Sequence, residues 1–390
     1  MPSSKHLSPG LVRLVPRPRW LPYLLTFLCF SLPALAQDSP TLTVDEQCAA
    51  PAYAPDGRLA YAVRRILTSR RLEIQRDDLW LVAADGKRRR IVNGEKLVQG
   101  PRGAGLVPFS YSIQSLRWSP DGARLTVEML TSEMVDQRGT TKEGVMTLLL
   151  DENGKEIKIA GGDSVIPEGT NAAWLADGAT VVYLQEAVKP KLLFSVNSVR
   201  PLGGRGGPIF SGHVFAAAAW NAKQGSGVAV ERDRSLSTPP HLVSLDLPKE
   251  TRLELATLEG YAGGLSLSPS GKKVAYFRDA QVLEIREVEQ PDRVARLRVA
   301  YGSYQWAPDE RRILMKRGLE HRSGDLAWLV LPPLASRASP ASAGQATIIE
   351  GELRPILHGL SFRDFALSPD GRSLAVIQPG KRSLLVYPVE

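Results

Sequence analysis

Six stretches of the sequence repeat one pattern, in which an apolar or aromatic segment is followed by a short turn and a second apolar segment. In the last copy, Ser368-Pro-Asp-Gly371 separates Phe365-Ala-Leu367 from Leu374-Ala-Val-Ile377. Proline presets φ for a turn, aspartate can bond to the backbone just ahead of it, and glycine accepts the left-handed conformation. Each copy therefore predicts a β-hairpin.

The other copies recur at a roughly constant spacing. They are Tyr53-Ala-Pro-Asp-Gly57, Trp118-Ser-Pro-Asp-Gly122, Trp174-Leu-Ala-Asp-Gly178, Leu267-Ser-Pro-Ser-Gly271 and Trp306-Ala-Pro-Asp-Glu310. The interval from Asp177 to Ser270 is about twice as long as a single repeat, and Ala216–Glu231 has the aromatic residue, turn and second strand of a degenerate copy. Repetition without helical periodicity indicates a repeat architecture. We predict an all-β, seven-bladed β-propeller, with six blades as the alternative.

The copy at Tyr53–Gly57 is followed by Leu59-Ala-Tyr61 and then by Leu79-Trp-Leu-Val-Ala-Ala-Asp-Gly86. This combination resembles the WD-like (PD40) repeat of TolB-type periplasmic proteins, which also occurs in the propeller domains of prolyl oligopeptidase-like enzymes. The resemblance covers nearly all of the chain after the leader. It implies a β-propeller and, by similarity to TolB, an interaction module of the cell envelope. The sequence departs from TolB in having no amino-terminal α/β domain, and from the peptidases in having no Gly-x-Ser-x-Gly motif.

Residues 1–36 have the features of a signal peptide. The segment has a basic start, an apolar run over Trp20–Leu32 and small residues at Ala34-Leu-Ala36, after which cleavage is expected. A membrane helix is one alternative, although the run is short and contains Pro22; a lipoprotein modified at Cys29 is another. We predict a periplasmic or secreted protein without a stable membrane span after cleavage, in which residues 37–390 form a single propeller domain.

Each blade should contain four antiparallel strands. In blade 2 the outermost strand is predicted at Glu156–Ile159. Blade 7 lacks an outermost strand of its own, and Thr41-Leu-Thr-Val44 has strand character. Pairing of Thr41–Val44 with Leu384–Tyr387 would close the ring and cover two open strand edges.

The net charge and the cysteines exclude two classes of protein. The formal charge is +8, and removal of the leader, which carries four Lys and Arg and no Asp or Glu, would lower it to +4. This charge is too small to indicate nucleic-acid binding. Of the two cysteines, only Cys48 would remain after cleavage, so no intramolecular disulfide could form. Cys48 is predicted to be a small buried residue on a strand.

No motif of a catalytic, cofactor or metal site is found. The histidines after the leader are His213, His241, His321 and His358, and none is paired with another at a ligand spacing on one strand. We therefore predict no catalytic residue, no cofactor and no metal, and a non-catalytic scaffold that binds a protein partner. The alternative is a small-ligand-binding protein or an enzyme of the hydrolase or lyase type that uses the central funnel.

The expanded connections all fall on the side opposite the Pro-Asp-Gly turns. They include Arg64–Arg76, Thr131–Gly144, Glu231–His241 and Lys316–Gly324. Long loops on a rigid scaffold are common binding surfaces. The predicted partner-binding residues are Arg64, Arg65, Arg70, Arg71, Arg76, Arg232, Arg234, Arg317 and Arg322. They indicate an acidic partner, whereas the interleaved Glu73 and Asp77 favour the alternative of solvated loop charges.

Overall fold

The computed structural model describes residues 39–69, 72–95, 110–134, 141–159, 164–187, 193–201, 204–260, 262–317, 324–336, 348–360, 362–379 and 383–389. All of them belong to one compact unit, Asp38–Glu390. Over these ranges the regular secondary structure is β-strand, and no helix is present. The predicted all-β class is confirmed.

The strands form antiparallel sets of four that follow one another along the chain, and each set is called a blade below. Blade 1 contains β2 (Cys48–Tyr53), β3 (Leu59–Val63), β6 (Asp78–Val82) and β7 (Arg88–Val92), and blade 2 contains β8 (Ser110–Trp118), β9 (Arg124–Met134), β10 (Thr141–Asp151) and β11 (Val165–Pro167). Blade 3 contains β12 (Gly169–Trp174), β13 (Val181–Glu186), β14 (Phe194–Arg200) and β15 (Gly204–Pro208). Blade 4 contains β16 (Val214–Asn221), β17 (Ser226–Arg232), β18 (His241–Asp246) and β19 (Thr251–Thr257). Blades 3 and 4 belong to one eight-stranded sheet because Phe194 pairs with Phe215.

Blades 5 to 7 repeat this order. Blade 5 contains β20 (Gly263–Leu267), β21 (Lys273–Phe277), β22 (Val282–Glu287) and β23 (Arg293–Arg298). Blade 6 contains β24 (Tyr304–Trp306), β25 (Arg312–Arg317), β26 (Gly324–Val330) and β29 (Leu353–Leu360). Blade 7 contains β30 (Asp364–Leu367), β31 (Ser373–Gln378), β32 (Ser383–Pro388) and β1 (Leu42–Val44). Two short strands extend blade 5 beyond β23, namely β27 (Ala335–Ser336) and β28 (Ile348–Glu350).

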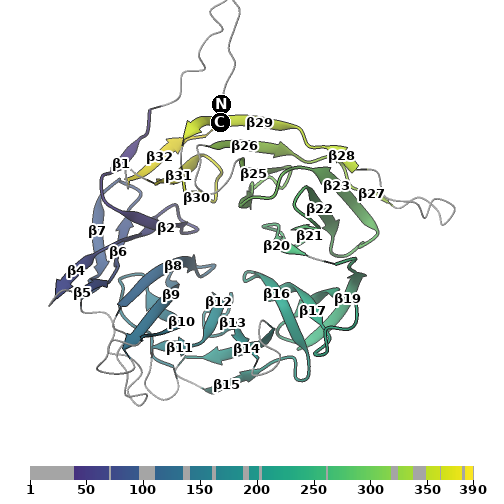
Figure 1. Cartoon of the computed structure of the whole chain (residues 1–390), viewed down its shortest axis with the longest axis horizontal. Coiled ribbons are helices and arrows are strands. Elements are labelled where there is room, and N and C mark those ends of the chain that lie inside the picture. Colours follow the sequence, from purple (N-terminus) through teal and green to yellow (C-terminus); the bar gives the residue numbers. More distant parts are fainter. Residues whose placement is uncertain are drawn as a thin grey trace, which may run out of the picture. The chain divides into compact units, whose positions relative to one another are not determined.

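The blades surround a central opening, and the first strand of each blade lies innermost (Figure 1). This arrangement is a β-propeller. The core lies between neighbouring blades: one buried cluster joins side chains of blades 1 and 2, and another joins blade 1 to blade 7. Each blade is therefore stabilised mainly by the two blades that flank it.

The repeated turns form as their residue types predict. In blade 2 the Gly122 amide donates to the Ser119 carbonyl at 2.9 Å, and the Asp121 carboxylate accepts the Ala123 amide at 3.0 Å. Gly122 has a φ of 70°, which a residue with a Cβ rarely adopts. Glu310 occupies this glycine position in blade 6, with a φ of 53°. Its carboxylate accepts bonds from the amide and hydroxyl of Ser270, so Glu310 links the turns of blades 5 and 6.

The fourth strand of blade 7 comes from the start of the described residues. Strand β1 pairs antiparallel with β32, with Leu42 opposite Val386 and Val44 opposite Leu384. The Val44 side chain is 1% exposed and packs in the cluster between blades 1 and 7. Cys48 is buried in the same cluster, as expected, and burial raises the pKa of its thiol to about 12.

The prediction for the outer edge of blade 2 is wrong. The outermost strand is β11, in which Val165 and Pro167 pair with Leu148 and Met146, whereas Glu156 forms only an isolated bridge to Leu150. The Asp151 carboxylate accepts the amides of Asn153 and Lys155 and holds a tight turn directly after β10. Glu156 therefore meets only the last residues of β10 and cannot pair along the strand. The middle of β10 is therefore paired by the later segment.

Two expanded loops contain more regular structure than expected. The predicted loop Thr131–Gly144 extends the β9–β10 hairpin, with Met134 opposite Thr141. The predicted loop Arg64–Arg76 contains a small sheet of β4 (Ile66–Ser69) and β5 (Leu72–Gln75). These segments are therefore hairpins that project from blades 1 and 2.

Candidate binding site at the channel mouth

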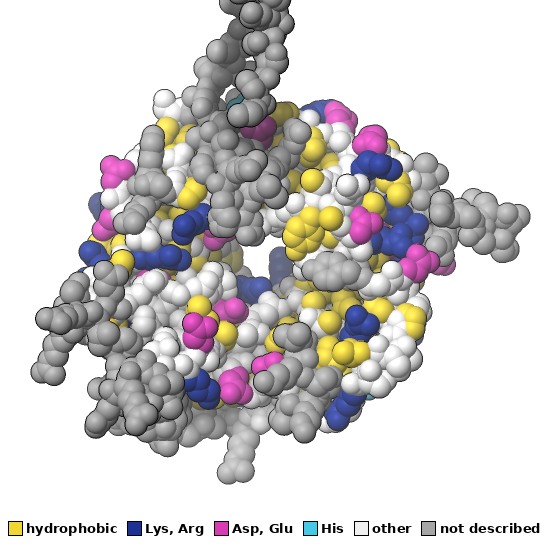
Figure 2. Space-filling model, in the orientation of Figure 1, with side chains coloured by type: hydrophobic (Ala, Val, Ile, Leu, Met, Phe, Trp, Pro, Cys, Tyr) yellow, Lys and Arg dark blue, Asp and Glu magenta, His cyan; other side chains and the backbone are white. Residues whose placement is uncertain are grey.

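A cavity of about 510 Å³ opens at the central axis, on the side where the Pro-Asp-Gly turns lie. Blades 1, 2, 4, 6 and 7 all contribute to its wall. The side chains that bear on its chemistry are Tyr53, Arg117, Trp118, Lys223, Gln305 and Phe365. Figure 2 shows the hollow in the middle of the molecule, with Lys and Arg side chains inside it. This cavity is called the channel mouth below.

The repeated stretch itself builds much of the channel mouth. Pro55, Pro120 and Pro369 come from three equivalent turns, and Tyr53 and Trp118 immediately precede two of these turns. Because the innermost strand of each blade ends at the same side of the ring, the residues at its end meet around the axis. From the sequence, these residues were expected only to form hairpins.

Side-chain bonds between adjacent inner strands hold this wall in place. The Trp118 indole donates to the Ala52 carbonyl at 3.1 Å, which ties blade 2 to blade 1. Gln305 accepts the Leu367 amide at 2.9 Å, which ties blade 6 to blade 7. Such bonds fix the aromatic and amide groups before any ligand arrives, and preorganisation reduces the entropic cost of binding.

Asn171 links three blades next to the channel mouth. It lies at a β-bulge with a φ of 50°, a conformation that asparagine tolerates better than most residues. Its amide oxygen accepts a bond from the Arg117 guanidinium at 2.8 Å, and its amide nitrogen donates to the Ala218 carbonyl at 2.7 Å. Arg117 is thereby oriented by the neighbouring blades.

Two cations provide the charge of the described wall. Lys223 is exposed on a turn of blade 4, and Arg117 is solvent-accessible within the channel but surrounded by protein. Desolvation lowers the pKa of Arg117, and the carboxylate of Glu128 partly opposes this shift. A guanidinium still stays charged near neutral pH. Because charges interact more strongly where water is partly excluded, the mouth favours an anionic group.

One hydroxyl in the wall has no hydrogen-bond partner among the described residues. The Tyr53 hydroxyl is buried and forms no hydrogen bond with any described residue. Burial raises the pKa of Tyr53, and the charge of Asp370 raises it further. An unpaired buried hydroxyl costs about 1–3 kcal/mol.

The described arginines predicted in blade 1 interact with residues of blade 1 and of the start of blade 2. Arg65 pairs with the buried Asp78 at 3.0 Å and with Glu46 at 3.7 Å. Arg64 is half-buried and favours the ionised form of Asp77. Arg76 forms a backbone bridge with Tyr111 at the start of blade 2. These residues help to attach the β4–β5 hairpin to the ring.

The other predicted arginines come from different parts of the ring. Arg232 and Arg234 lie at the β17–β18 connection of blade 4, and Arg317 ends β25 in blade 6. Figure 1 places these elements on different sides of the central opening from β4 and β5. Arg70, Arg71 and Arg322 lie outside the described residues, as does the side chain of Arg317. The described arginines do not gather in one site, and their role in partner binding stays a prediction.

Asp77 beside Arg64 gives a testable pH dependence. Its carboxylate is fully buried and accepts bonds from the Ile113 amide at 2.8 Å and the Gln75 side chain at 3.1 Å. Burial outweighs these bonds and raises its pKa to about 6. Since the folded protein holds this proton more tightly than the unfolded chain, whose aspartates titrate near ~4, stability should fall as pH rises from about 4 to about 6.

We expect Asp77→Asn to raise the free energy of unfolding at pH 7 by up to about 3 kcal/mol and to change it little at pH 4. The amide of Gln75 can rotate to accept the new Asn donor, so both bonds survive. Urea denaturation of both proteins at several pH values measures this. Burial also raises the pKa of Asp364 to about 6. Asp364 therefore makes the stability of both proteins fall with rising pH over the same range. Equal slopes for Asp77→Asn and the original protein would contradict the prediction.

Histidine–carboxylate pairs are present that the spacing in the sequence did not reveal. His213 bonds through Nδ1 to Glu231, which also pairs with Arg252 at 2.9 Å. His241 bonds through Nδ1 to Glu254 at 2.8 Å. These partners lie on neighbouring strands, so only the strand register brings them together. Within the described ranges, no group of three or more His, Cys, Asp or Glu is arranged to hold a metal ion.

Comparison with known proteins agrees with the fold. No protein-family model matches the chain, and no curated protein matches it. Among solved structures, a chain of the mitotic checkpoint complex is similar over 96% of this chain and 99% of its own, with 13% identity and a TM-score of 0.51. The β-propeller domain of Myceliophteria thermophila Cps50 (Swd1) is similar over 90% of this chain and 100% of its own, with 12% identity and a TM-score of 0.51. In the described part of the chain, no helix has the length and apolar character to cross a membrane.

Proposed function

We propose that this protein is an exported β-propeller scaffold of the cell envelope that binds an acidic protein partner at the channel mouth. The observation that carries the proposal is the wall of the mouth, in which Arg117 and Lys223 accompany the aromatic rings of Tyr53, Trp118 and Phe365. The segment bound there is an extended acidic stretch of the partner. Export rests on the predicted leader, residues 1–36, and the envelope location also on the similarity to the TolB-type repeat.

The dimensions and chemistry of the mouth suit an extended peptide. A cavity of about 510 Å³ accommodates a few residues of extended chain, and the prolines and rings provide flat apolar surface for its backbone and side chains. The side chain of Gln305 supplies a polar contact. A carboxylate of the partner would lie near Arg117 or Lys223. Rigid walls and a few polar groups are typical of sites that select one orientation of a bound chain.

Affinity capture with the tagged mature protein from an envelope fraction tests the proposal. We expect a partner to be recovered at low salt, to diminish at higher salt, and to bind at least about tenfold less tightly to the Arg117→Gln, Lys223→Ala double variant. Arg117→Lys, which keeps the cation, should retain more of the binding than Arg117→Gln. Melting temperatures verify that the variants are folded.

The matched control is Arg232→Ser with Arg234→Ser, which removes the same charge from the opposite side of blade 4. This variant should capture the partner as well as the original protein does. Loss of binding in the control with retention in the Arg117 and Lys223 variant would contradict the site and favour the loop arginines. Absence of any captured protein would contradict the scaffold function itself.

A further inference from the structure

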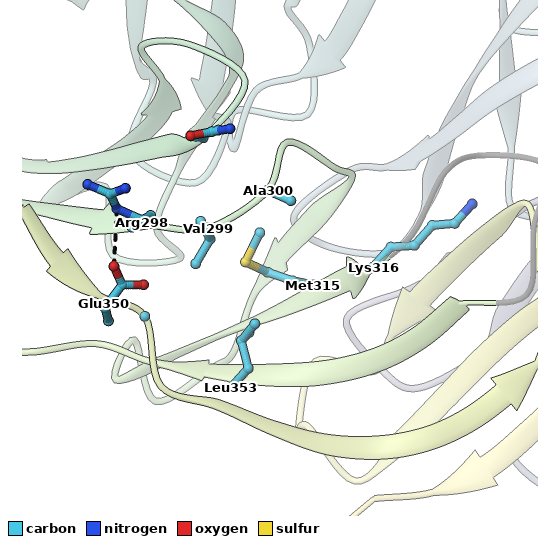
Figure 3. Close-up of a pocket in the computed structure, with 9 residues that line it drawn as sticks. Arg298, Val299, Ala300, Met315, Lys316, Glu350 and Leu353 are labelled. Atoms are coloured by element: carbon cyan, nitrogen blue, oxygen red, sulfur yellow. Dashed lines mark ion pairs between the residues drawn. The ribbon is translucent and has the colours of Figure 1, made fainter.

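A second cavity, of about 560 Å³, lies between blades 5 and 6 and shares no residue with the channel mouth. Its wall comes from the end of β23, the connection that follows it, β25, and the segment from β28 to β29. Figure 3 shows Val299, Met315 and Leu353 gathered in its middle, with Arg298 and Glu350 to one side. The cavity therefore has an apolar centre with Arg298 and Glu350 at one border, and it is also lined by Lys316, whose ammonium donates to the Phe362 carbonyl at 2.9 Å.

The apolar centre belongs to the core of the two blades. Val299 is 5% exposed and Met315 is 2% exposed, and both pack in the cluster that includes Leu329. Because these side chains are held by the core, the apolar surface of the cavity is rigid. A ligand that covers it would gain the free energy of apolar burial without reordering the protein.

Gly351 keeps the cavity wall close to this centre. A Cβ added at Gly351 would lie 2.5 Å from Cγ1 of Val299 and 2.9 Å from Cδ1 of Leu329. Only glycine allows the backbone to approach so closely. The wall therefore continues directly from the core to Glu350 at the border.

The charged border is an ion pair that can change partners. Nε of Arg298 lies 3.1 Å from Oε1 of Glu350, and the two side chains are 55% and 80% exposed. Glu350 ends the fully exposed strand β28. Exposed pairs of this kind contribute little to stability, so separating them costs little. A ligand carboxylate could then replace that of Glu350 on the planar guanidinium, which suits bidentate binding.

We infer that this cavity binds a small organic acid that combines an apolar body with one carboxylate. The body lies on Val299, Met315 and Leu353, and the carboxylate pairs with Arg298 in place of Glu350. The inference does not depend on the proposed scaffold function, because the two sites use different residues and different blades. It predicts that acids bind in preference to alcohols of the same shape.

Methyl NMR of methionine-labelled protein tests the inference, with the Met315 signal assigned by Met315→Leu. The probes are hexanoate, octanoate and 4-phenylbutyrate, with 1-hexanol, 1-octanol and 4-phenyl-1-butanol as neutral counterparts. We expect at least one acid to shift the Met315 signal with a submillimolar dissociation constant and its alcohol to bind about two- to fivefold more weakly, the effect of losing one ion pair with an exposed arginine.

Two variants of the border should move the affinity in opposite directions. Arg298→Gln should weaken the binding of the acid about two- to fivefold and leave that of the alcohol unchanged. Glu350→Gln should tighten the binding of the acid by a similar factor, because Arg298 loses its competing partner. Arg354→Gln and Glu352→Gln are matched controls, since they divide a similar exposed pair that does not line the cavity. Both should leave the affinity unchanged.

Two results would overturn the inference. One is that no acid of the series shifts the Met315 signal at concentrations up to about 10 mM, which would place every dissociation constant far above the submillimolar value expected. The other is that acid and alcohol bind equally and neither Arg298→Gln nor Glu350→Gln changes the affinity. All four substituted residues are exposed charged side chains, and an unchanged melting temperature shows that a lost signal reports binding and not unfolding.

Discussion

Replacing Val44 by Asp should lower the free energy of unfolding by more than about 4 kcal/mol, because it places an unpaired carboxylate in the cluster between blades 1 and 7. Thr43→Asp changes the neighbouring residue of the same strand, whose side chain is exposed, and should cost less than about 1 kcal/mol. Urea denaturation of the two variants measures the difference. The difference between the two variants separates the effect of burying the new carboxylate from the effect of adding a charge to β1.

Deletion of residues 37–46 should have a comparable effect, because it removes β1 and leaves the edge of β32 unpaired. The melting temperature should fall markedly, and the deleted protein should associate more readily through the open edge. If the deletion leaves the melting temperature unchanged, or if Val44→Asp is as mild as Thr43→Asp, then β1 does not contribute to stability as its burial implies.

Glu284→Gln should be the second strongly destabilising change, by about 3–5 kcal/mol at pH 7. Glu284 is 1% exposed in blade 5, where its carboxylate lies 2.6 Å from the Arg286 guanidinium, 2.9 Å from Arg296 and 3.6 Å from Arg278. Gln preserves the shape but leaves these three cations without a buried anion. Glu259→Gln, which removes an 85% exposed partner of Arg278, should change the stability by less than about 0.5 kcal/mol.

The effect of Glu284→Gln should also depend on pH with a definite sign. Burial alone would raise the pKa of Glu284, but Arg286, Tyr276 and Arg296 outweigh it, so the pKa lies below its ordinary value. The stabilisation is then fully present above the pKa of the unfolded chain, ~4.3, and is lost as pH falls through the lower folded value. Denaturation curves should show the difference between the two proteins shrinking below about pH 4. A constant difference would contradict the role assigned to the charge.

The hairpins could be predicted from the sequence because their determinants are local. Pro120, Asp121 and Gly122 act on their own turn, and the bonds expected of them are present. The alanine-rich strand β16 could be placed because Trp220 and the turn after it follow the same order. The segment Thr41–Val44 has strand character in the sequence, and Leu42–Val44 pairs with β32.

The outer strands and the site could not be predicted in the same way. Whether Glu156–Ile159 or Val165–Pro167 pairs with β10 depends on where the intervening chain rejoins the strand, which no local residue specifies. The channel mouth combines residues that are far apart in sequence, so Lys223 and Phe365 become neighbours of one cavity only when the ring forms. The arginines of the loops carry no local signal for where their side chains point, and Arg65 pairs with Asp78 of its own blade.

The pairing of β1 with β32 also determines when folding can finish. The Thr41 hydroxyl bonds to the Val386 carbonyl across 345 residues of chain. A ribosome that adds about 5–20 residues per second needs roughly 20 to 70 seconds to supply the second partner. During that interval blades already synthesised can assemble, but strand β1 has no partner because β32 has not been made. Blade 7 therefore stays without its fourth strand until Val386 has been made, which leaves a period in which a chaperone could engage the chain.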